Sequence, residues 1–402
     1  MKREASWITQ TVVALYVVLC SGYALSTVYG YTTALLTIGI ILSVLLMVLK
    51  RDWLIPYDLR TLACICFVLM IVFSMICNQQ GDSRRYLNYV FSCLVAYAIS
   101  KNISARTFYD YFSKAMVWIT AISLVGYYLV NYTTLLSGLP RMINSNESEY
   151  TVGYIFNYIT RMPERNCGVF WEPGVFASFL CTAMLYEILF SSQKIRVLRI
   201  VLFSVGIYTA NSSAGFALWA VCMISLLTKR KNSQEVLNLR SILSAIVFGC
   251  ALFAIANVDS IISMIIFKNN PYLAKLSSEH IASSERGFAF THNIGIFAEH
   301  PLFGAGFKIT DSLMQHYADT STTTYFMSLF GIMGVSYTVF WIIAVLRQKK
   351  LNLYSKILVL IVILSIINKE PHGLILFTWC TLFYLLSTER NKDACRNSLY
   401  ID

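Results

Sequence analysis

Arginine occurs beside proton-accepting side chains in two polar stretches of the sequence. One stretch, RMPERNCGVFWEPG (161–174), contains Arg165 and Glu172, and the other, ERGFAFTHNIGIFAEHPLFGAGF (285–307), contains Arg286 and two histidines. Arginine is always charged and its planar fork matches phosphate oxygens, whereas a carboxylate or an imidazole can accept a proton from a reacting hydroxyl. These residue types are therefore suited to binding an anionic group and moving a proton.

Glu172 is the strongest candidate for a general base. It lies about one turn into an apolar run, where a carboxylate is costly and usually functional. The alternatives are an ion pair with an arginine or a cap on a helix that is broken at Pro173. Burial would raise the pKa of Glu172 and a neighbouring arginine would lower it, so its charge state stays open. His300 and His292 are the second choices.

The elements that carry these residues are apolar runs. Of the 402 residues, 57% are hydrophobic and 13% charged, about half the charged fraction of a soluble domain, and the mean hydropathy is +0.61. Runs of roughly 17–25 apolar residues can cross a bilayer as helices. The sequence predicts an all-α, polytopic membrane protein that forms a single membrane domain (1–402). We expect twelve spans, near residues 7–28, 31–49, 61–77, 86–100, 113–131, 168–190, 197–210, 212–228, 241–258, 322–346, 353–367 and 373–388.

The distribution of Lys and Arg predicts the topology. When both termini are placed inside, the inner segments hold 22 of the 32 basic residues, although the outer segments include the two longest loops. This is the positive-inside pattern, so we expect both termini in the cytoplasm. The net charge of +11 therefore reflects topology. Binding of nucleic acid would need a basic stripe with interleaved aromatic residues, which is not evident, so we expect no nucleic-acid partner.

Two outer connections, 131–167 and 259–321, are long, and their aromatic residues, proline and glycine indicate ordered loops. In the second loop, Pro301 ends a helical segment. Gly304 and Gly306 permit a tight turn or close approach to a ligand, and a plain helix–turn is the alternative. The sequence has no CxxC pair and no His/Cys cluster, so we expect no metal site.

Three stretches together carry a resemblance to a known family. They are the stretch from Arg165 to Pro173, the stretch YTANSSAGF around Thr209, and the stretch that runs from Arg286 to PLFGAG. In this order and spacing they resemble the O-antigen polymerase and ligase superfamily, multispanning inner-membrane enzymes that act on polyprenyl-diphosphate-linked glycans. The resemblance covers about residues 160–345; the first five spans match only in hydropathy. It implies a GT-C-like helical architecture with both long loops in the periplasm.

One departure separates the two branches of that superfamily. The ligase branch has a histidine at the start of the helix after the glycines, where this chain reads STTTY and places Thr322. The sequence is therefore more similar to the Wzy-type polymerases. The ligase remains the nearest alternative, and a lipid-linked glycan flippase or transporter is the alternative from another class. A transporter would need charged residues well inside several spans, and few are present.

The resemblance implies a chemistry for the two loops. The donor would be a glycan on undecaprenyl diphosphate, the acceptor a hydroxyl of another lipid-linked repeat unit, and no cofactor would be required. Arg165 and Arg286 would bind the diphosphate, with Arg161 in support, and Glu172 would be the catalytic base. Interfacial anchoring is the alternative for the arginines. A chain-length regulator is the implied protein partner, and the substrate-binding set would also include His300, Gly304, Gly306 and Ser213.

Two polar turns between spans have plainer interpretations. The serines of TANSSAG, Ser213 among them, are suited to capping the following helix. The stretch NKEPHG (368–373) lies between the last two expected spans, and we expect its Lys369 and Glu370 to form an ion pair in a solvated turn.

Overall fold

The computed structural model describes residues 7–28, 30–50, 58–78, 83–143, 149–191, 195–228, 285–311 and 318–387. The expected span 241–258 and the part of the second loop up to residue 284 lie outside these residues. The described part is mostly helical, as predicted. Its α-helices are α1 (Trp7–Leu19), α2 (Ala24–Val28), α3 (Thr32–Lys50), α4 (Leu59–Asn78), α5 (Ser83–Asn102), α6 (Ala105–Tyr132), α7 (Pro173–Leu189), α8 (Arg196–Ala210), α9 (Ser213–Thr228), α13 (Glu285–Glu299), α14 (Gly306–Thr310), α15 (Thr322–Phe330), α16 (Ile332–Leu346), α17 (Leu353–Ile367) and α18 (Leu376–Leu386).

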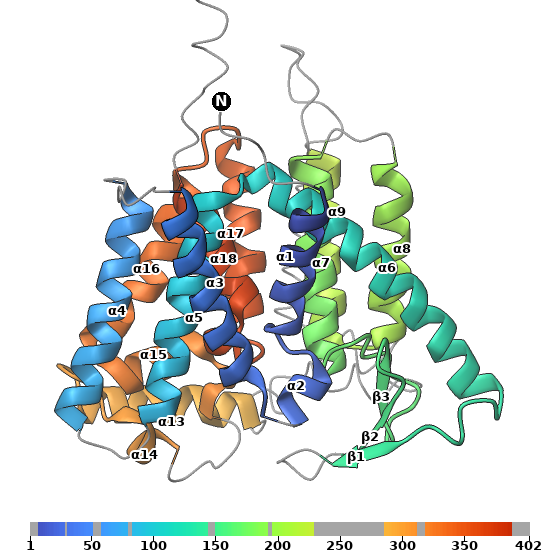
Figure 1. Cartoon of the computed structure of the whole chain (residues 1–402), viewed down its shortest axis with the longest axis horizontal. Helices are drawn as coiled ribbons and strands as arrows, with labels where there is room; N and C mark the ends of the chain where they lie inside the picture. Colours follow the sequence, from blue (N-terminus) through green and yellow to red (C-terminus); the bar gives the residue numbers. More distant parts are fainter. Residues whose placement is uncertain are drawn as a thin grey trace, which may run out of the picture.

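The long helices stand side by side in a bundle, and α13 lies across one end of it (Figure 1). The same end carries α2, α14 and a small sheet, and we call it the site end. Helix α7 is strongly enclosed, because nearly all of its side chains are buried against α6, α8 and α9. A helix that is apolar all round is expected in such a position.

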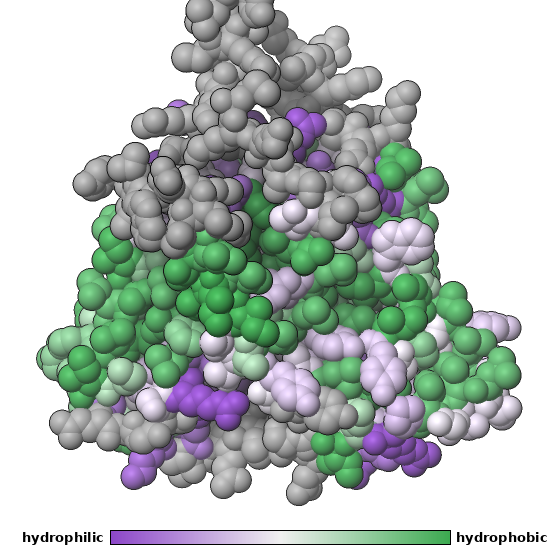
Figure 2. Space-filling view, in the orientation of Figure 1, coloured by the Kyte–Doolittle hydropathy of each residue, from purple (hydrophilic) through white to green (hydrophobic). Residues whose placement is uncertain are grey.

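The outer face of the bundle is apolar. Along α4, one face is buried and the opposite face exposes large hydrophobic side chains at helical spacing, namely Leu62, Ile65, Leu69, Phe73 and Ile76. Figure 2 shows hydrophobic residues over much of the middle of one face, with hydrophilic residues towards both ends. Within the described residues, α4 and α6 are long and apolar enough to cross a membrane, and several shorter helices are also apolar.

Two expected spans are interrupted. The run 7–28 forms α1 and α2 with a turn between them, and the run 322–346 forms α15 and α16, which meet at Gly331. Gly331 has a φ of +64°, and a Cβ there would lie 2.5 Å from the carbonyl oxygen of Leu302. The break therefore accommodates the backbone of the glycine-rich turn, a contact that hydropathy does not reveal.

The first long loop contains three short β-strands, which the sequence did not predict, within a mostly helical structure. Strands β1 (Arg141–Ile143), β2 (Glu149–Val152) and β3 (Asn157–Ile159) form an antiparallel sheet in the order β1-β2-β3. Tyr150 of β2 pairs with Met142 and Ile159. The sheet lies at the site end, beside the C-terminal part of α6 (Figure 1).

Candidate functional site

The loop 165–172 is fastened to the end of α8 through Asn166. The Asn166 amide N–H donates to the carbonyl of Thr209 (2.9 Å), and its side-chain Nδ2 donates to Thr209 Oγ1 and to Ser123 Oγ, both at 3.1 Å. Asn166 Oδ1 accepts from the N–H of Gly168 (2.9 Å), which shapes the turn that follows. The first and second motif stretches are therefore in direct contact.

The other side of this loop is held by the turn between α1 and α2. The N–H of Ala24 donates to the carbonyl of Val169 (2.9 Å), the N–H of Trp171 donates to the carbonyl of Gly22 (3.2 Å), and Tyr23 forms a β-bridge with Phe170. Phe170 is buried and its ring lies 4.5 Å from that of Phe179 in α7. The loop 165–172 is thus held in place by residues 22–24, which precede it in the sequence, and by Thr209, which follows it.

Glu172 is half-buried and directly precedes α7, so it does not lie one turn inside a helix as the sequence suggested. Pro173 is the first helical residue, a position that suits proline because no N–H is required there. The backbone of Glu172 is extended, and its carboxylate makes no capping hydrogen bond to the helix. The proposed cap is therefore not the role of this side chain.

Arg165 and Glu172 act on a common neighbour, the Cys167 thiol. Burial raises the pKa of Cys167 to about 12, with Arg165 acting to lower it and Glu172 to raise it. The fold thus brings this arginine and this carboxylate into one small region. Arg161, in contrast, is exposed in the turn after β3.

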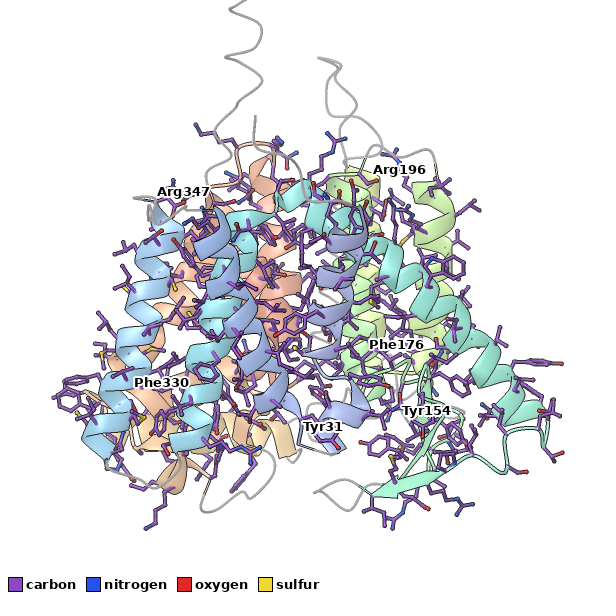
Figure 3. All side chains as sticks on the ribbon, in the orientation of Figure 1. Tyr31, Tyr154, Phe176, Arg196, Phe330 and Arg347 are labelled. Carbon is purple, nitrogen blue, oxygen red and sulfur yellow. The ribbon has the colours of Figure 1, made fainter. Side chains whose placement is uncertain are left out.

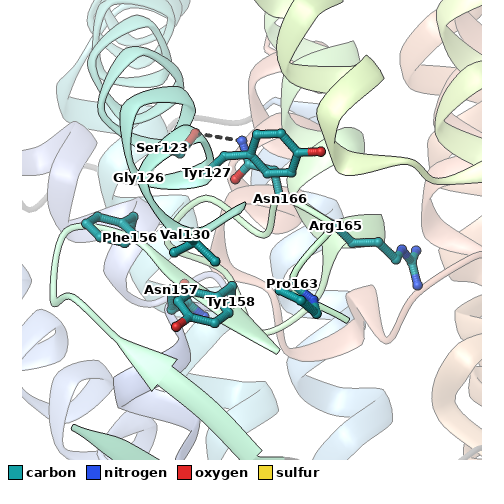
Figure 4. Close-up of a pocket in the computed structure, with 10 residues that line it drawn as sticks. All are labelled: Ser123, Gly126, Tyr127, Val130, Phe156, Asn157, Tyr158, Pro163, Arg165 and Asn166. Carbon is teal, nitrogen blue, oxygen red and sulfur yellow. Dashed lines mark hydrogen bonds between the residues drawn. The ribbon is translucent and has the colours of Figure 1, made fainter. Parts of the chain in front are cut away.

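A small pocket opens beside the same loop, between α6 and the sheet (Figure 4). Its aromatic lining comes from Tyr127, Phe156 and Tyr158, and Arg165 contributes to the rim. Figure 4 shows the guanidinium of Arg165 directed away from the other lining residues. This arginine is therefore placed to meet a group outside the pocket.

Lys369 and Glu370 do not form a solvated turn, and that prediction was wrong. Lys369 is only 6% exposed and Glu370 only 2%. Lys369 Nζ donates to Ser212 Oγ (2.9 Å) and to the carbonyl of Gly174 (3.4 Å), and it lies 3.9 Å from Glu370 Oε1. Because Gly174 belongs to the first turn of α7 and Ser212 precedes α9, one ammonium group joins the N-terminal ends of these two helices.

Ser212 also caps α9, since its Oγ accepts from the N–H of Gly215 (3.4 Å). The capping role that the sequence suggested for this hairpin therefore falls to Ser212. Ser213 is the first residue of α9 and is half-buried.

Thr322 and His372 complete the buried cluster, which we call the inner centre: Lys369, Glu370, His372, Ser212 and Thr322. Thr322 Oγ1 donates to the carbonyl of Glu370 (3.3 Å) and accepts from the N–H of His372 (3.0 Å). His372 Nδ1 is 2.9 Å from Thr378 Oγ1, and His372 Nε2 has no hydrogen-bond partner. Burial and then Lys369 lower the pKa of His372 to about 3, so its ring is neutral.

The glycine turn, residues 300–307, contacts a different part of the site end. Gly304 has a φ of +72°, and a Cβ there would lie 2.2 Å from the Leu329 carbonyl oxygen. Gly306 packs against Asn78 and Tyr86, and His300 is exposed. These contacts account for both glycines by packing against backbone and side chains. Arg286 lies in the first turn of α13, where only the backbone is described.

A second charged cluster follows the glycine turn. Arg85, at the start of α5, forms an ion pair with Asp311 and donates to the hydroxyl of Tyr325 (3.0 Å), and its guanidinium lies 4.2 Å from the centre of the Phe307 ring. Asp319, in the 3₁₀ turn Ala318–Thr320, interacts electrostatically with Asp311 and Arg85 of this cluster. Burial, followed by repulsion from Asp311, raises the pKa of Asp319 to about 7.

Neither the inner centre nor the cluster of Arg85, Asp311 and Asp319 was predicted from the sequence as part of a site. Asp311 and Asp319 follow the glycine turn in a stretch of the long loop without a recognisable motif, and Arg85 precedes an apolar run like many interfacial cations. One signal was present for Lys369, because it is a charged residue between two short apolar runs on the side with few basic residues. Among the described residues, no group of three or more His, Cys, Asp or Glu is arranged to hold a metal ion.

Comparisons of the chain with protein-family models, with curated proteins and with solved structures found no match. The site is therefore interpreted from its own geometry and from the sequence motifs.

Proposed function

We propose that the protein is a glycan polymerase of the cytoplasmic membrane. It transfers a chain from one polyprenyl diphosphate to a hydroxyl group of another lipid-linked repeat unit, and the site end faces the periplasm. The observation that carries the proposal is the placement of Arg165 and Glu172 in one short loop, which hydrogen bonds of Asn166 fasten to the second motif stretch at Thr209. A cation and a carboxylate in one place are what a diphosphate leaving group and an acceptor hydroxyl require.

The apolar outer face supports a location in the bilayer. Contiguous exposed hydrophobic side chains on a soluble monomer are rare beyond a few hundred square ångströms, whereas lipid would cover the exposed face of α4. Figure 3 places Arg196 and Arg347 at the end opposite to the site, and Tyr31 and Tyr154 at the site end. Basic residues on the cytoplasmic side and tyrosine at the outer interface fit twelve spans with both termini inside.

The proposed reaction uses the side chains as follows. The acceptor oxygen attacks the anomeric carbon of the donor, and the bond from that carbon to the diphosphate oxygen breaks. Its electron pair stays on the diphosphate, where Arg165 and Arg286 balance the added charge. The proton of the acceptor hydroxyl passes to Glu172. Arg161, Ser213 and the residues of the glycine turn would contact the glycan or the lipid carrier.

The buried charges of α7 argue against the transporter alternative. Glu187, near the other end of α7, is fully buried, and it accepts hydrogen bonds from Arg199 (2.6 Å) and from Ser113. A carboxylate already paired and enclosed in this way has a structural role and is not suited to lining a transport path.

Gene deletion tests the proposal against the ligase alternative. Cells without a polymerase should still display surface glycan with a single repeat unit, because the ligation step remains. Cells without a ligase should lose that product as well. Gel analysis of the glycolipid distinguishes these outcomes, and long chains in the deletion strain would refute the proposal.

Substitution of Arg165 tests the diphosphate role. An Arg165→Ala protein present at normal level should lose long chains, with polymerisation falling by a factor of about 100 or more, since one charge-stabilising group typically contributes this much. Arg141→Ala is the matched control, because Arg141 is exposed in the same loop and pairs with Glu149 at 3.5 Å. Equal chain lengths in both variants would remove Arg165 from the mechanism.

A further inference from the structure

The inner centre places a buried ammonium group, paired with a carboxylate, beside the first turn of α7. The N-terminus of a helix carries roughly half an elementary charge, and the N-terminal ends of α7 and α9 meet at Lys369. Glu370 is the nearby anion, and its Oε1 would lie 2.2 Å from a Cβ placed on Gly174. A buried ion pair of this kind adds little to stability by itself, so the pair calls for another account.

Glu172 occupies the position where this charge would act. It directly precedes α7, two residues before the carbonyl that Lys369 holds. Arg165 and Cys167 belong to the same loop as Glu172. Tyr23 of the α1–α2 turn pairs with Phe170 of that loop. The other ionisable groups are Lys369, Glu370 and His372 of the inner centre, which are buried. Cys167 and His372 are neutral near pH 7, so the charged groups among these neighbours are Arg165, Lys369 and Glu370.

We propose that Lys369 is a positioning residue for the transfer reaction: it locks the N-terminal ends of α7 and α9 together and keeps the Glu172 carboxylate ionised and ready to accept a proton. The inference rests on the proposed function. It adds a group that the motif resemblance does not contain and that touches neither substrate. Gly174 is required at its position because any side chain there would displace Glu370 and Lys369.

The pH dependence of polymerisation tests this role. Purified protein in lipid vesicles would receive lipid-linked repeat units extracted from a strain that lacks the gene, and the initial rate would be measured from pH 5 to pH 9. In Lys369→Met, loss of a positive charge disfavours the carboxylate form of Glu172. The acid limb of the pH–rate profile, where the rate falls as the pH decreases, should therefore move to higher pH by about one unit. Lys369→Arg keeps the charge and should retain the wild-type limb.

Glu370→Gln is the control in which the acid limb should move in the opposite direction. Removal of the negative charge favours ionisation of Glu172, so the acid limb should move to lower pH, and a variant with both substitutions should return towards the wild-type profile. A purely structural role for Lys369 would lower the amount of folded protein or the maximal rate without moving the limb, and that result would overturn the inference. A wild-type protein that forms no polymer in this assay would instead contradict the proposed function.

Discussion

The burial of three ionisable side chains, Lys369, Glu370 and His372, is the residue-scale feature that most changes the interpretation of the sequence. Charged side chains are almost never buried without partners. Here Lys369 binds Ser212 before α9, Glu370 lies beside Lys369, and His372 contacts Thr378 of α18. The sequence shows only that the three residues are adjacent to apolar runs. Their enclosure depends on α7, α9, α15 and α18, and therefore cannot be read from the local stretch NKEPHG.

The neutral state of His372 predicts a pH-dependent stability. Its pKa is lowered to about 3 in the folded protein, whereas an exposed histidine in the unfolded chain titrates near 6.5. The unfolded chain therefore binds more protons between these values, and stability is complete above about pH 6.5 and falls as the pH decreases towards 3. At pH 5 the loss should be about 2 kcal/mol.

Thermal unfolding in detergent at pH 7.5 and pH 5 measures this effect. His372→Gln should show a smaller fall in Tm between the two values than the wild-type protein does. His300→Gln is the control, because His300 is exposed and its replacement should leave the fall unchanged. The same fall in wild type and His372→Gln would contradict the assignment of a buried neutral ring.

Part of the site could be predicted at the level of residues. The first two motif stretches meet in the structure because Asn166 binds Thr209, and this fits their joint appearance in the sequence. The ligand role suggested for Gly304 has a competing explanation, since its lack of a side chain is required by the Leu329 carbonyl. Glycine permits close approach by backbone and by ligand alike, and the sequence cannot tell which partner is present.

At the scale of elements, the positions of most apolar helices could be predicted and their interruptions could not. Hydropathy located most of α3 to α9 to within a few residues, although α6 begins at Ala105, well before the expected span 113–131. It merged α15 with α16 because Gly331 changes the average hydropathy of its surroundings very little, although its positive φ ends one helix and begins another. The three short strands were missed because each pairs with a neighbour in the loop and none has a long alternating pattern.

The contact between the glycine turn and the α15–α16 junction predicts a large effect of Gly304→Ala. The added Cβ would meet a backbone carbonyl, and the positive φ is unfavourable for alanine, so a loss of about 2 kcal/mol or more is expected. Gly295→Ala is the matched control in α13, where no atom lies within 4 Å of the added Cβ. That change should stabilise the helix by roughly 0.5–1 kcal/mol.

Chemical unfolding of the two glycine variants in the same detergent compares them directly. Opposite changes in unfolding midpoint are expected. Equal midpoints for Gly304→Ala and wild type would show that the turn does not pack on the α15–α16 junction as described.

At the scale of the whole molecule, the proposed orientation predicts which residues are reached from outside the cell. Arg161 and Lys308 are exposed at the site end, and Lys349 is exposed in the segment between α16 and α17. Single cysteines at 161 and 308 should react with a membrane-impermeant maleimide on spheroplasts, whereas a cysteine at 349 should react only after permeabilisation. The background should carry serine in place of Cys77, which is exposed, and of Cys250 and Cys395.

The reverse labelling pattern would place the site in the cytosol and end the polymerase proposal, since the proposed reaction joins lipid-linked repeat units on the outer face. Labelling of all three positions without permeabilisation would show that the reagent had entered, and the positions would then be compared with a smaller reagent dose.

The link from Lys369 to Gly174 and Ser212 also has a consequence for the order of biosynthesis. The loop 165–172 is held by residues 22–24 and 209, which leave the ribosome before or soon after it does. The ammonium group follows the two helix ends that it joins by 157 and 195 residues. A nascent chain released before codon 369 would thus carry all three motif stretches and still lack the inner centre, which is completed only when the turn between α17 and α18 has been made.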